Sequence, residues 1–447
     1  MAQCLDLGLR RRADAAYAAL PPDRRTPLLD IRLALAKSDF DAVDALLECV
    51  AAPASGVPPC NESQLSRIVD LTAPVSPRGS LRVIQNRLPM HPARAALALA
   101  LGEVDEFERS MQIGAQRLGP DRLLLRANTV APGDRLTLLN RFFNECGLRE
   151  VGLLDDHAPL SVTNLRQLEL PPSATAATPR LSVVLTAFNA EAYVAAAMRS
   201  VLDQEMRELE LIAVDDCSSD GTWTAMQVLA ASDERVTAVR LARNLGTYAA
   251  KNVGLELASG EFVAFQDADD WSHPDRFSRC LALLDQNPRC VAVSCSYIRL
   301  TDTGQFHSTK LWPMTRWTPN SMMFRRLDVL NRVGFLDENR FGADSEFVSR
   351  VRAQFGSAAL LKLQLPLIVA AHRSGSLTTS QETGIDARGQ SETRALYEES
   401  WTEELVGKLL RGEPLLRQPE ATLNDAAAVF ERRPSGAGLR SQSRQTR

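Results

Sequence analysis

Three aspartates, Asp267, Asp269 and Asp270, crowd together in the stretch FQDADDW, at the end of the apolar run EFVAF. Side chains alternate along an extended segment, so Asp267 and Asp269 are expected on one face. Two carboxylates about 4 Å apart repel each other by about 4 kcal/mol at an effective dielectric constant of about 20. A cation would relieve this repulsion, and few oxygen ligands suit Mg²⁺ or Mn²⁺, with phosphate oxygens and water completing the shell. The alternative is a solvated turn, because aspartate is also common in turns and caps.

Polar residues also follow two other apolar runs. Phe188 and Asn189 come directly after LSVVLTA, and Asp215 and Asp216 end or follow LELIAV. Open parallel sheets bind their ligands at the carboxyl ends of strands. We therefore expect these side chains to lie with the three aspartates at one edge of a sheet. Asp220, in an Asp-Gly pair, is interpreted as a turn residue instead.

Glycine-rich signatures of other nucleotide-binding classes are absent from these loops. Neither GxGxxG nor GxxxxGK occurs there, which argues against a dinucleotide dehydrogenase and against a phosphate-loop ATPase. A sugar-nucleotide pyrophosphorylase would need a glycine-rich loop after the first strand, and TAFNAEAY does not provide one.

The segment that carries these motifs alternates short apolar runs, rich in β-branched residues, with helical patterns. LSVVLTAF, LELIAVDD, VTAVRLA and EFVAFQDADD are separated by three helical stretches. This alternation predicts an α/β domain, with a mostly parallel sheet flanked by helices and right-handed crossovers.

Residues 1–170 have a helical pattern instead. LLDIRLALAKSDFDAVDALLECV and ARAALALALGEVDEFERSMQIGAQRL both place apolar residues at three-and-four spacing, and the two resemble each other. Each predicts two helices joined by a short turn, in the manner of tetratricopeptide-like hairpin repeats. Binding of a protein partner, positioning of an acceptor and simple structural support are all open as roles for this region.

Changes in composition predict the domain boundaries. PPSATAATPR, residues 171–180, is interpreted as a linker, and residues 181–385 as the α/β domain. Residues 386–432 are expected to form C-terminal helices, through TRALYEESWTEELVGKLL and LNDAAAVFERR, and residues 433–447 a disordered tail.

Composition and charge limit the compartment and the partners. The 447 residues are 45% hydrophobic and 24% charged, with a formal net charge of −4, so we expect a soluble multidomain protein with no nucleic-acid partner. No signal-peptide core and no run of about 18 apolar residues occurs, which predicts a cytoplasmic chain without a transmembrane segment. The eight cysteines form no CxxC pair and no zinc-like spacing with histidine. Reduced thiols are expected.

Four stretches, in order, resemble glycosyltransferase family 2, the inverting enzymes with the GT-A fold. They are LSVVLTAFNAEAYVAAAMRSVLDQ, LELIAVDDCSSDGT, RNLGTYAAKNVGLELASGEFVAFQDADDW and GFLDENRFGADSEFVSRV, and they cover roughly residues 180–380. A single acidic triplet would be a weak signal, whereas four ordered motifs at compatible spacing are a strong one.

The resemblance implies a nucleotide-binding set. Asp215 would hold the base, since a carboxylate accepts the imide N–H of uracil, and Phe188 and Asn189 would line the base pocket. Asp267 would lie near the ribose and the metal. Lys251 stands where the family often carries arginine, and it would meet a phosphate near a helix N-terminus, with a solvated lysine as the alternative.

The resemblance also implies a metal and a general base. Asp269 would be the principal ligand of Mg²⁺ or Mn²⁺, with Asp267 beside it, whereas Asp270 is expected to cap the next helix. His372 lies where relatives often place a residue near the diphosphate or metal, and a metal ligand and a structural histidine are equally weighted; Arg373 is the alternative contact to phosphate. Asp344 is the expected base, because inverting transfer needs a carboxylate facing the cation across the sugar. Ala343 departs from the glutamate common in the family, which leaves a contribution of Glu346 open.

These features together predict a metal-dependent inverting glycosyltransferase. It would move a sugar from a nucleotide-activated donor, such as a UDP-sugar, to a glycan or lipid-linked acceptor in surface or capsular polysaccharide synthesis. A peripheral position at the inner face of the membrane would be compatible with a lipid-linked acceptor. The alternative function is a catalytically silent sugar-nucleotide-binding scaffold whose helical region binds a partner.

Overall fold

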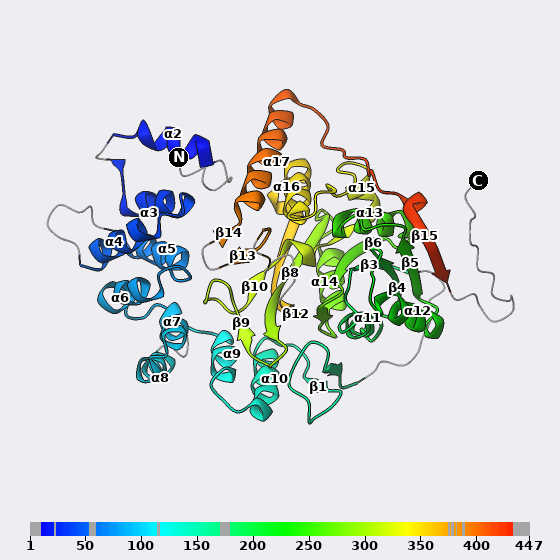
Figure 1. Ribbon diagram of the computed structural model, residues 1–447, viewed down its shortest axis with the longest axis horizontal. Coiled ribbons are helices and arrows are strands. Elements are labelled where there is room, and N and C mark those ends of the chain that lie inside the picture. Colours follow the sequence, from blue (N-terminus) through cyan, green and yellow to red (C-terminus); the bar gives the residue numbers. More distant parts are fainter. Residues whose placement is uncertain are drawn as a thin grey trace. The chain divides into compact units, whose positions relative to one another are not determined.

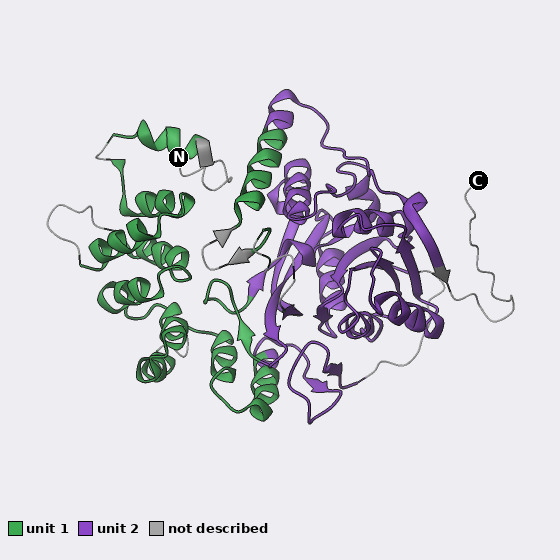
Figure 2. Ribbon diagram, viewed as in Figure 1, with its two compact units in different colours: residues 1–142, 305–315, 373–406 green, residues 143–304, 316–372, 407–447 purple. Residues whose placement is uncertain are grey.

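The structure is a computed structural model, and its contacts divide the chain into two compact units (Figure 2). The first unit comprises residues 1–142, 305–315 and 373–406, and the second comprises residues 143–304, 316–372 and 407–447. The predicted domain boundaries at residues 170, 180 and 385 stay predictions. Most of the predicted linker, and the predicted disordered tail at 433–447, lie outside the described residues. The structure describes residues 10–21, 24–52, 60–113, 117–169, 179–373, 376, 380, 382–386 and 389–431.

The first unit is built from helices along residues 10–142 (Figure 1). Two short strands, β13 (Ile385–Asp386) and β14 (Gly389–Gln390), form a small hairpin in it, and β9 (Phe306–His307) lies in its second segment. Its helices are α2 (Arg10–Ala18), α3 (Pro27–Ala36), α4 (Phe40–Ala51), α5 (Glu62–Thr72), α6 (Pro77–Arg87), α7 (Ala93–Leu101), α8 (Val104–Ile113), α9 (Asp121–Ala127), the short η2 (Pro132–Asp134) and α10 (Arg135–Glu145), which ends in the second unit.

The two predicted helical hairpins are present. In the first, α3 and α4 pack together, and the Asp39 carboxylate caps α4 by accepting the Ala42 N–H at 3.1 Å. In the second, α7 ends at Gly102, whose φ of 73° is the left-handed conformation that ends helices, and α8 begins two residues later. The short turns and the caps in the sequence therefore determine where each pair of helices folds back.

The segment 305–315 belongs to the first unit because it is bonded to α9. Asp121 is buried, and its carboxylate accepts the Thr315 N–H at 2.9 Å. Asn128 exchanges two hydrogen bonds of 2.7 Å with the backbone of Phe306. No local sequence pattern predicts these contacts, because the partners are more than 170 residues apart in the sequence.

The second unit holds the predicted α/β domain, with a mixed sheet whose path runs β15-β5-β4-β3-β6-β11-β8-β12-β7 (Figure 1). The four strands expected from the sequence pair in parallel, as do β8 and β12, whereas β7, β10, β11 and β15 pair antiparallel. Its strands are β3 (Leu181–Ala187), β4 (Leu209–Asp215), β5 (Val236–Leu241), β6 (Phe262–Asp267), β7 (Asp270–Ser272), β8 (Ala292–Thr301), β10 (Arg316–Trp317), β11 (Met323–Arg325), β12 (Leu360–His372) and β15 (Ala426–Glu431), with a separate hairpin of β1 (Val151–Leu153) and β2 (Leu165–Gln167).

Helices and short 3₁₀ turns connect these strands. They are α11 (Val194–Leu202), α12 (Thr222–Ser232), α13 (Thr247–Leu257), α14 (Arg276–Gln286), η3 (Pro319–Ser321), α15 (Arg326–Leu330), α16 (Ala343–Phe355), η4 (Ser357–Ala359), α17 (Glu392–Arg411), which begins in the first unit, and η5 (Leu423–Asp425).

The order of the strands makes the carboxyl end of β3 a topological switch point. Because β3 lies between β4 and β6, the direction in which the chain adds strands reverses there, and ligands of open α/β sheets bind at such a point. Ala187 of β3 pairs with Asp215 of β4, and Thr186 pairs with Asp267 of β6. Both strand-end aspartates therefore lie on the same edge, as the sequence predicted.

Helix α13 packs unusually close to the centre of the sheet. Its apolar face joins a core cluster with alternate residues of the strands, among them Val184, Ile212 and Val214. Gly254 faces Val184, and a Cβ at this glycine would lie 2.4 Å from Val184 Cγ1. The missing side chain thus sets the distance between α13 and β3.

Two predicted features of the second unit are wrong. LNDAAAVFERR was expected to be helical, but Ala426–Glu431 forms strand β15 beside β5. The unpaired hydrogen-bonding edge of β5 overrides the helix propensity of the alanines. Asp270 was expected to cap the following helix, but it starts β7, opposite Ala370 of β12, and α14 begins only at Arg276.

Substitution of Gly254 should reverse the usual effect of alanine in a helix. Gly254→Ala is expected to destabilise the fold by about 1–3 kcal/mol through overpacking against Val184, although alanine normally gains about 1 kcal/mol over glycine in a helix. Gly407→Ala in α17 is the matched control, because its new Cβ would meet only the flexible end of Arg411. Urea unfolding of both variants tests the packing; equal stabilities would contradict it.

His273 should make the stability depend on pH in the acid range. It is fully buried, its Nε2 lies 3.0 Å from the Arg149 carbonyl oxygen, and its Nδ1 accepts the Asp275 N–H at 3.2 Å. Burial lowers its pKa to about 4 from the usual 6.5. Since the unfolded chain binds this proton more readily, the free energy of unfolding is expected to fall between pH 6.5 and 4, by about 1.4 kcal/mol per pH unit at most.

His273→Gln should flatten this slope, because no imidazole remains to be protonated. His157→Gln, at an exposed histidine, should leave it unchanged. Urea unfolding at several pH values measures the slope, and an unaltered slope in His273→Gln would assign the acid sensitivity elsewhere.

Candidate active site

A buried cation holds the acidic loop from below. Arg276 of α14 is 1% exposed, and its guanidinium donates to Gln266 Oε1 at 2.6 Å and to the Phe265 carbonyl at 2.8 Å. Gln266 Nε2 in turn donates to the backbone carbonyl of Asp270 at 2.7 Å. The backbone of the FQDADDW stretch is therefore fixed by hydrogen bonds that are closed to water.

The acidic side chains above this network are half-buried, and their negative charges lie close together. Burial raises the pKa of the Asp270 carboxyl well above its usual range, and the negative charges of Asp269 and Asp267 raise it further. The positive charges of Arg299 and Arg276 act against this rise without cancelling it. Ionisation of Asp270 beside Asp267 and Asp269 is therefore unfavourable in this loop.

Lys251 and Asn320 hold Asp267 on both sides. The Lys251 side chain is 3% exposed, and its Nζ lies 3.1 Å from Asp267 Oδ1. Asn320 of η3 donates its amide to Asp267 Oδ2 at 2.5 Å and accepts from Lys251 Nζ at 2.6 Å. Lys251 is therefore not a solvated lysine; its charge lies in the same site as the acidic loop.

Helix α13 also connects the acidic loop to Asp344. Tyr248 lies one turn before Lys251 on the same helix face, and the Lys251 ammonium is 5.5 Å from the centre of its ring. The Tyr248 hydroxyl donates to Asp344 Oδ1 at 3.0 Å. One helix thus contacts both the carboxylate expected at the metal and the carboxylate expected to act as base.

The N-terminus of α16 presents Asp344. Gly342, with φ of 75°, lets the chain turn sharply into this helix, and Asp344 is half-buried in its first turn. Acidic side chains interact favourably with the partial positive charge of a helix N-terminus. Glu346 is instead buried and hydrogen bonded to Arg350, at 2.8 Å between Oε2 and Nη2. It is placed to support the helix.

Asp215 and the Phe188-Asn189 loop lie next to each other. Asp215 is fully buried, which raises the pKa of its carboxyl, and its Oδ1 accepts the Ser218 N–H at 3.2 Å. Asn189 ties the two loops together, since its Oδ1 accepts the Ser219 N–H at 2.9 Å. Phe188 is 48% exposed, so its ring is available to a ligand at this edge.

The remaining acids of this edge have structural partners. Asp216 accepts the backbone N–H groups of Leu245 at 2.7 Å and Gly246 at 2.8 Å, which fixes the start of α13. Asp220 accepts the Thr222 N–H at 3.0 Å and so shapes the turn before α12. The turn role predicted for Asp220 agrees with these bonds.

His372 ends β12, two residues beyond Ala370, which pairs with Asp270. The fold therefore brings it to the acidic loop from the far end of the domain sequence. Burial, and then the charge of Arg299, lower its pKa, which keeps the imidazole neutral and able to donate a lone pair to a metal.

The acidic loop fits a divalent cation whose shell is completed from outside the protein. Across the described ranges, no three His, Cys, Asp or Glu side chains are grouped as a complete metal site. Mg²⁺ in particular is commonly held by one or two carboxylates together with substrate phosphates and water. The carboxylates of Asp267 and Asp269 match that kind of site.

Two residues that the sequence reasoning did not select complete the arrangement. Tyr248 precedes Lys251 by three residues, and this spacing indicates that the two side chains share one helix face. Asn320 carries no such signal, because it lies 53 residues after Asp267 and meets it only through the sheet.

The part of the chain that the structure describes contains no helix long and apolar enough to cross a membrane. No disulfide bond links the cysteines of the described residues.

The ion pair of Lys251 should be visible in stability. Asp267→Asn would leave the buried ammonium without a counter-charge, which is expected to cost about 3 kcal/mol. Adding Lys251→Met to Asp267→Asn should recover at least half of the loss, whereas Asp269→Asn alone should not destabilise. Urea unfolding of the full chain in a chelator measures all three; equal losses in Asp267→Asn and Asp269→Asn would refute the pairing.

Comparison with known proteins matches the same part of the chain. The model of the family described as Glycosyl transferase family 2 matches residues 182–344. This range contains every predicted site residue except His372.

Curated relatives each match only a part of this chain. A protein named for teichuronic acid biosynthesis, TuaG of Bacillus subtilis, is 41% identical over 106 residues, which are 24% of this chain and 42% of that protein. The succinoglycan biosynthesis protein ExoO of Rhizobium meliloti is 36% identical over 122 residues, 27% of this chain and 34% of that protein. A GalNAc(5)-diNAcBac-PP-undecaprenol beta-1,3-glucosyltransferase of Campylobacter jejuni is 42% identical over 94 residues, 21% and 30% of the two chains. The chain thus spans less than half the length of these relatives.

Among solved structures, the chain is similar to residues 1–349 of TarS from S. aureus in complex with UDP-GlcNAc. The identity is 19%, the TM-score is 0.39, and the match covers 52% of this chain and 71% of that one.

Proposed function

Because residues 182–344 belong to glycosyl transferase family 2, we propose that the chain transfers a sugar from a nucleotide-activated donor to an acceptor hydroxyl, with inversion at the anomeric carbon. The observation that carries this proposal is the double contact of α13. Lys251 of this helix pairs with Asp267, and Tyr248 of the same helix bonds Asp344. An acidic loop suited to a metal and a carboxylate suited to a base are thereby held around one space.

The nucleotide would bind at the end of β4. Asp215 Oδ2 accepts no hydrogen bond from the described residues, and it lies 3.3 Å from Arg240 Nε. The imide N–H of uracil would supply the missing donor, which favours a UDP-sugar. Asn189 would keep the base loop in place, and the exposed ring of Phe188 would cover the base.

The diphosphate would bind over the acidic loop. Asp269 is the principal candidate to hold Mg²⁺ or Mn²⁺, with Asp267 and His372 beside it. The cation would stabilise the negative charge that develops on the leaving diphosphate. Lys251 supports this role indirectly, because its pairing with Asp267 fixes the direction of that carboxylate.

Asp344 would act as the general base. Tyr248 occupies Oδ1, which leaves Oδ2 to accept the proton of the acceptor hydroxyl. As the proton moves to Asp344, the hydroxyl oxygen forms its bond to the anomeric carbon, and the bond from that carbon to the diphosphate oxygen breaks. The nucleoside diphosphate leaves with the electron pair.

The acceptor would be a glycan or a lipid-linked glycan in the synthesis of a surface or capsular polysaccharide. Names of the relatives support this class, since they refer to teichuronic acid, to succinoglycan and to an undecaprenol-linked glycan. We infer a cytoplasmic location, with contact to the inner face of the membrane if the acceptor is lipid-linked. The helical first unit would bind a protein partner or position the acceptor.

A panel of nucleotide sugars tests the proposal. The full chain with Mn²⁺ is expected to release nucleoside diphosphate from one sugar nucleotide in the presence of an acceptor extract, and that donor should raise its thermal midpoint. Binding without release would favour the alternative, a silent sugar-nucleotide-binding scaffold.

Two substitutions should separate binding from transfer. Asp344→Asn keeps the acceptor atom for Tyr248 but cannot take a proton, so turnover should fall by about 10²–10⁴ while donor affinity stays the same. Asp269→Ala should abolish metal-dependent donor binding. Asp328→Asn, at an exposed aspartate of α15, is the control for both. Near-normal turnover in Asp344→Asn would refute the assignment of the base.

A further inference from the structure

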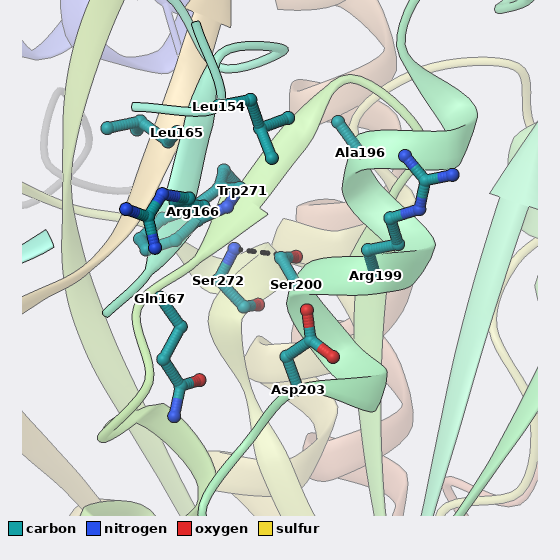
Figure 3. Close-up of a pocket in the computed structure, with 10 residues that line it drawn as sticks. All are labelled: Leu154, Leu165, Arg166, Gln167, Ala196, Arg199, Ser200, Asp203, Trp271 and Ser272. Atoms are coloured by element: carbon teal, nitrogen blue, oxygen red, sulfur yellow. Dashed lines mark hydrogen bonds between the residues drawn. The ribbon is translucent and has the colours of Figure 1, made fainter. Parts of the chain in front are cut away.

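A small cavity lies between the β1–β2 hairpin, helix α11 and strand β7 (Figure 3). It encloses about 30 Å³, the room of about two water molecules, within a wider hollow of about 350 Å³ that includes open solvent. The hairpin precedes residues 182–344, so this cavity is built partly from sequence outside the family domain. None of the residues assigned above to the donor or the base lines it. Its lining residues are Leu154, Leu165, Arg166, Gln167, Ala196, Arg199, Ser200, Asp203, Trp271 and Ser272.

Trp271 provides an unused hydrogen-bond donor in this cavity. Only 3% of the residue is exposed, and Figure 3 shows the ring beside Arg166, facing α11. Within the described part of the chain, no acceptor bonds its indole N–H. Among the described residues, the buried side-chain atoms that lack a partner do not include this nitrogen, so solvent reaches it and an acceptor from outside the chain can bond it.

The hydroxyls at the floor of the cavity are already satisfied. Ser200 Oγ accepts the Ser272 N–H at 3.0 Å and donates to the Ala197 carbonyl at 2.7 Å. Ser272 Oγ donates to Gln266 Oε1 at 2.7 Å. The floor is therefore rigid and does not compete for a ligand's polar group.

Two arginines lie on opposite rims. Arg166 donates Nε to the Leu153 carbonyl at 2.7 Å, which orients its guanidinium while the other N–H groups remain exposed. Arg199 is exposed on α11, and its positive charge acts on Asp203 one helical turn further along. Asp203 is the one acidic side chain of the lining, so the lining carries more positive than negative charge. Planar guanidinium groups bind carboxylate and phosphate oxygens in pairs.

We propose that this cavity is a second ligand site, for a small organic anion whose single carboxylate or phosphate group enters between Arg166, Arg199 and the Trp271 indole N–H. The volume admits one such group, and the wider hollow takes the rest of the molecule against Leu154 and Ala196. Asp203, one helical turn after Arg199, would accept a hydroxyl of that molecule. Because β7 joins Trp271 directly to Asp270, the bound anion would rest on the back of the acidic loop.

The site is independent of the proposed glycosyl transfer and can be tested without a donor. The full chain, in a chelator and without nucleotide, is titrated by calorimetry with inorganic phosphate, glucose 1-phosphate and glucuronate, and with neutral glucose as a control. At least one of the three anions should bind saturably, and glucose should bind more weakly than any anion that binds saturably. The anion with the lowest dissociation constant shows whether the charged group is free phosphate, a phosphate ester or a carboxylate.

Substitutions locate the binding. Arg199→Ala removes a charge-assisted hydrogen bond, so the dissociation constant should rise about tenfold or more. Trp271→Phe keeps the ring but loses the N–H, and it should weaken binding by about threefold to tenfold. Arg289→Ala, at an exposed arginine of the same unit, should bind as the unchanged chain does.

A second measurement reports on the cavity alone. In the ¹⁵N-labelled chain, the indole signal that disappears in Trp271→Phe should shift when the anion is added. Absence of saturable binding by any of the three anions would overturn the proposal. So would binding that persists unchanged in both Arg199→Ala and Trp271→Phe, with an unmoved indole signal, since the anion would then lie elsewhere.

Discussion

The crowding of Asp267, Asp269 and Asp270 at one sheet edge is the constraint on which the rest of the active-site architecture depends. Like charges so close together are held only because the backbone beneath them is fixed and part of the charge is balanced. Arg276 supplies the fixing from below through bonds to Gln266 and the Phe265 carbonyl. Lys251 balances Asp267 from the side. Burial, and then the charges of Asp269 and Asp267, raise the pKa of Asp270, and a cation at the loop would favour the ionised carboxylates.

Helix α13 transmits that arrangement to the other half of the site. It can do so because Gly254 lets the helix lie against β3, where a side chain would collide with Val184. With the helix at that distance, Lys251 reaches Asp267 and Tyr248 reaches Asp344. Asp216 fixes the same helix at its start through the N–H groups of Leu245 and Gly246. The packing of one helix thus couples the core of the sheet to the spacing of the two groups that would carry the chemistry.

The sequence predicted what local patterns determine. Strand ends, helical hairpins and the edge shared by Asp215 and Asp267 follow from periodicity and from the geometry of parallel sheets. Contacts between distant segments could not be predicted in this way. Asn320 meets Asp267 across 53 residues, and β15 forms because the edge of β5 is open, against the local propensity of its alanines. Asp270 failed as a helix cap for the same reason, since pairing with β12 draws it into β7.

The central claim is that the acidic loop binds a divalent cation together with a nucleoside diphosphate. Electron paramagnetic resonance of Mn²⁺ tests it most directly, because bound Mn²⁺ loses the sharp signal of the free ion. We expect UDP and the full chain together to remove about one equivalent of that signal per chain beyond what UDP removes alone. If the loss of signal with UDP and the chain together equals the sum of the losses with each alone, the account is contradicted.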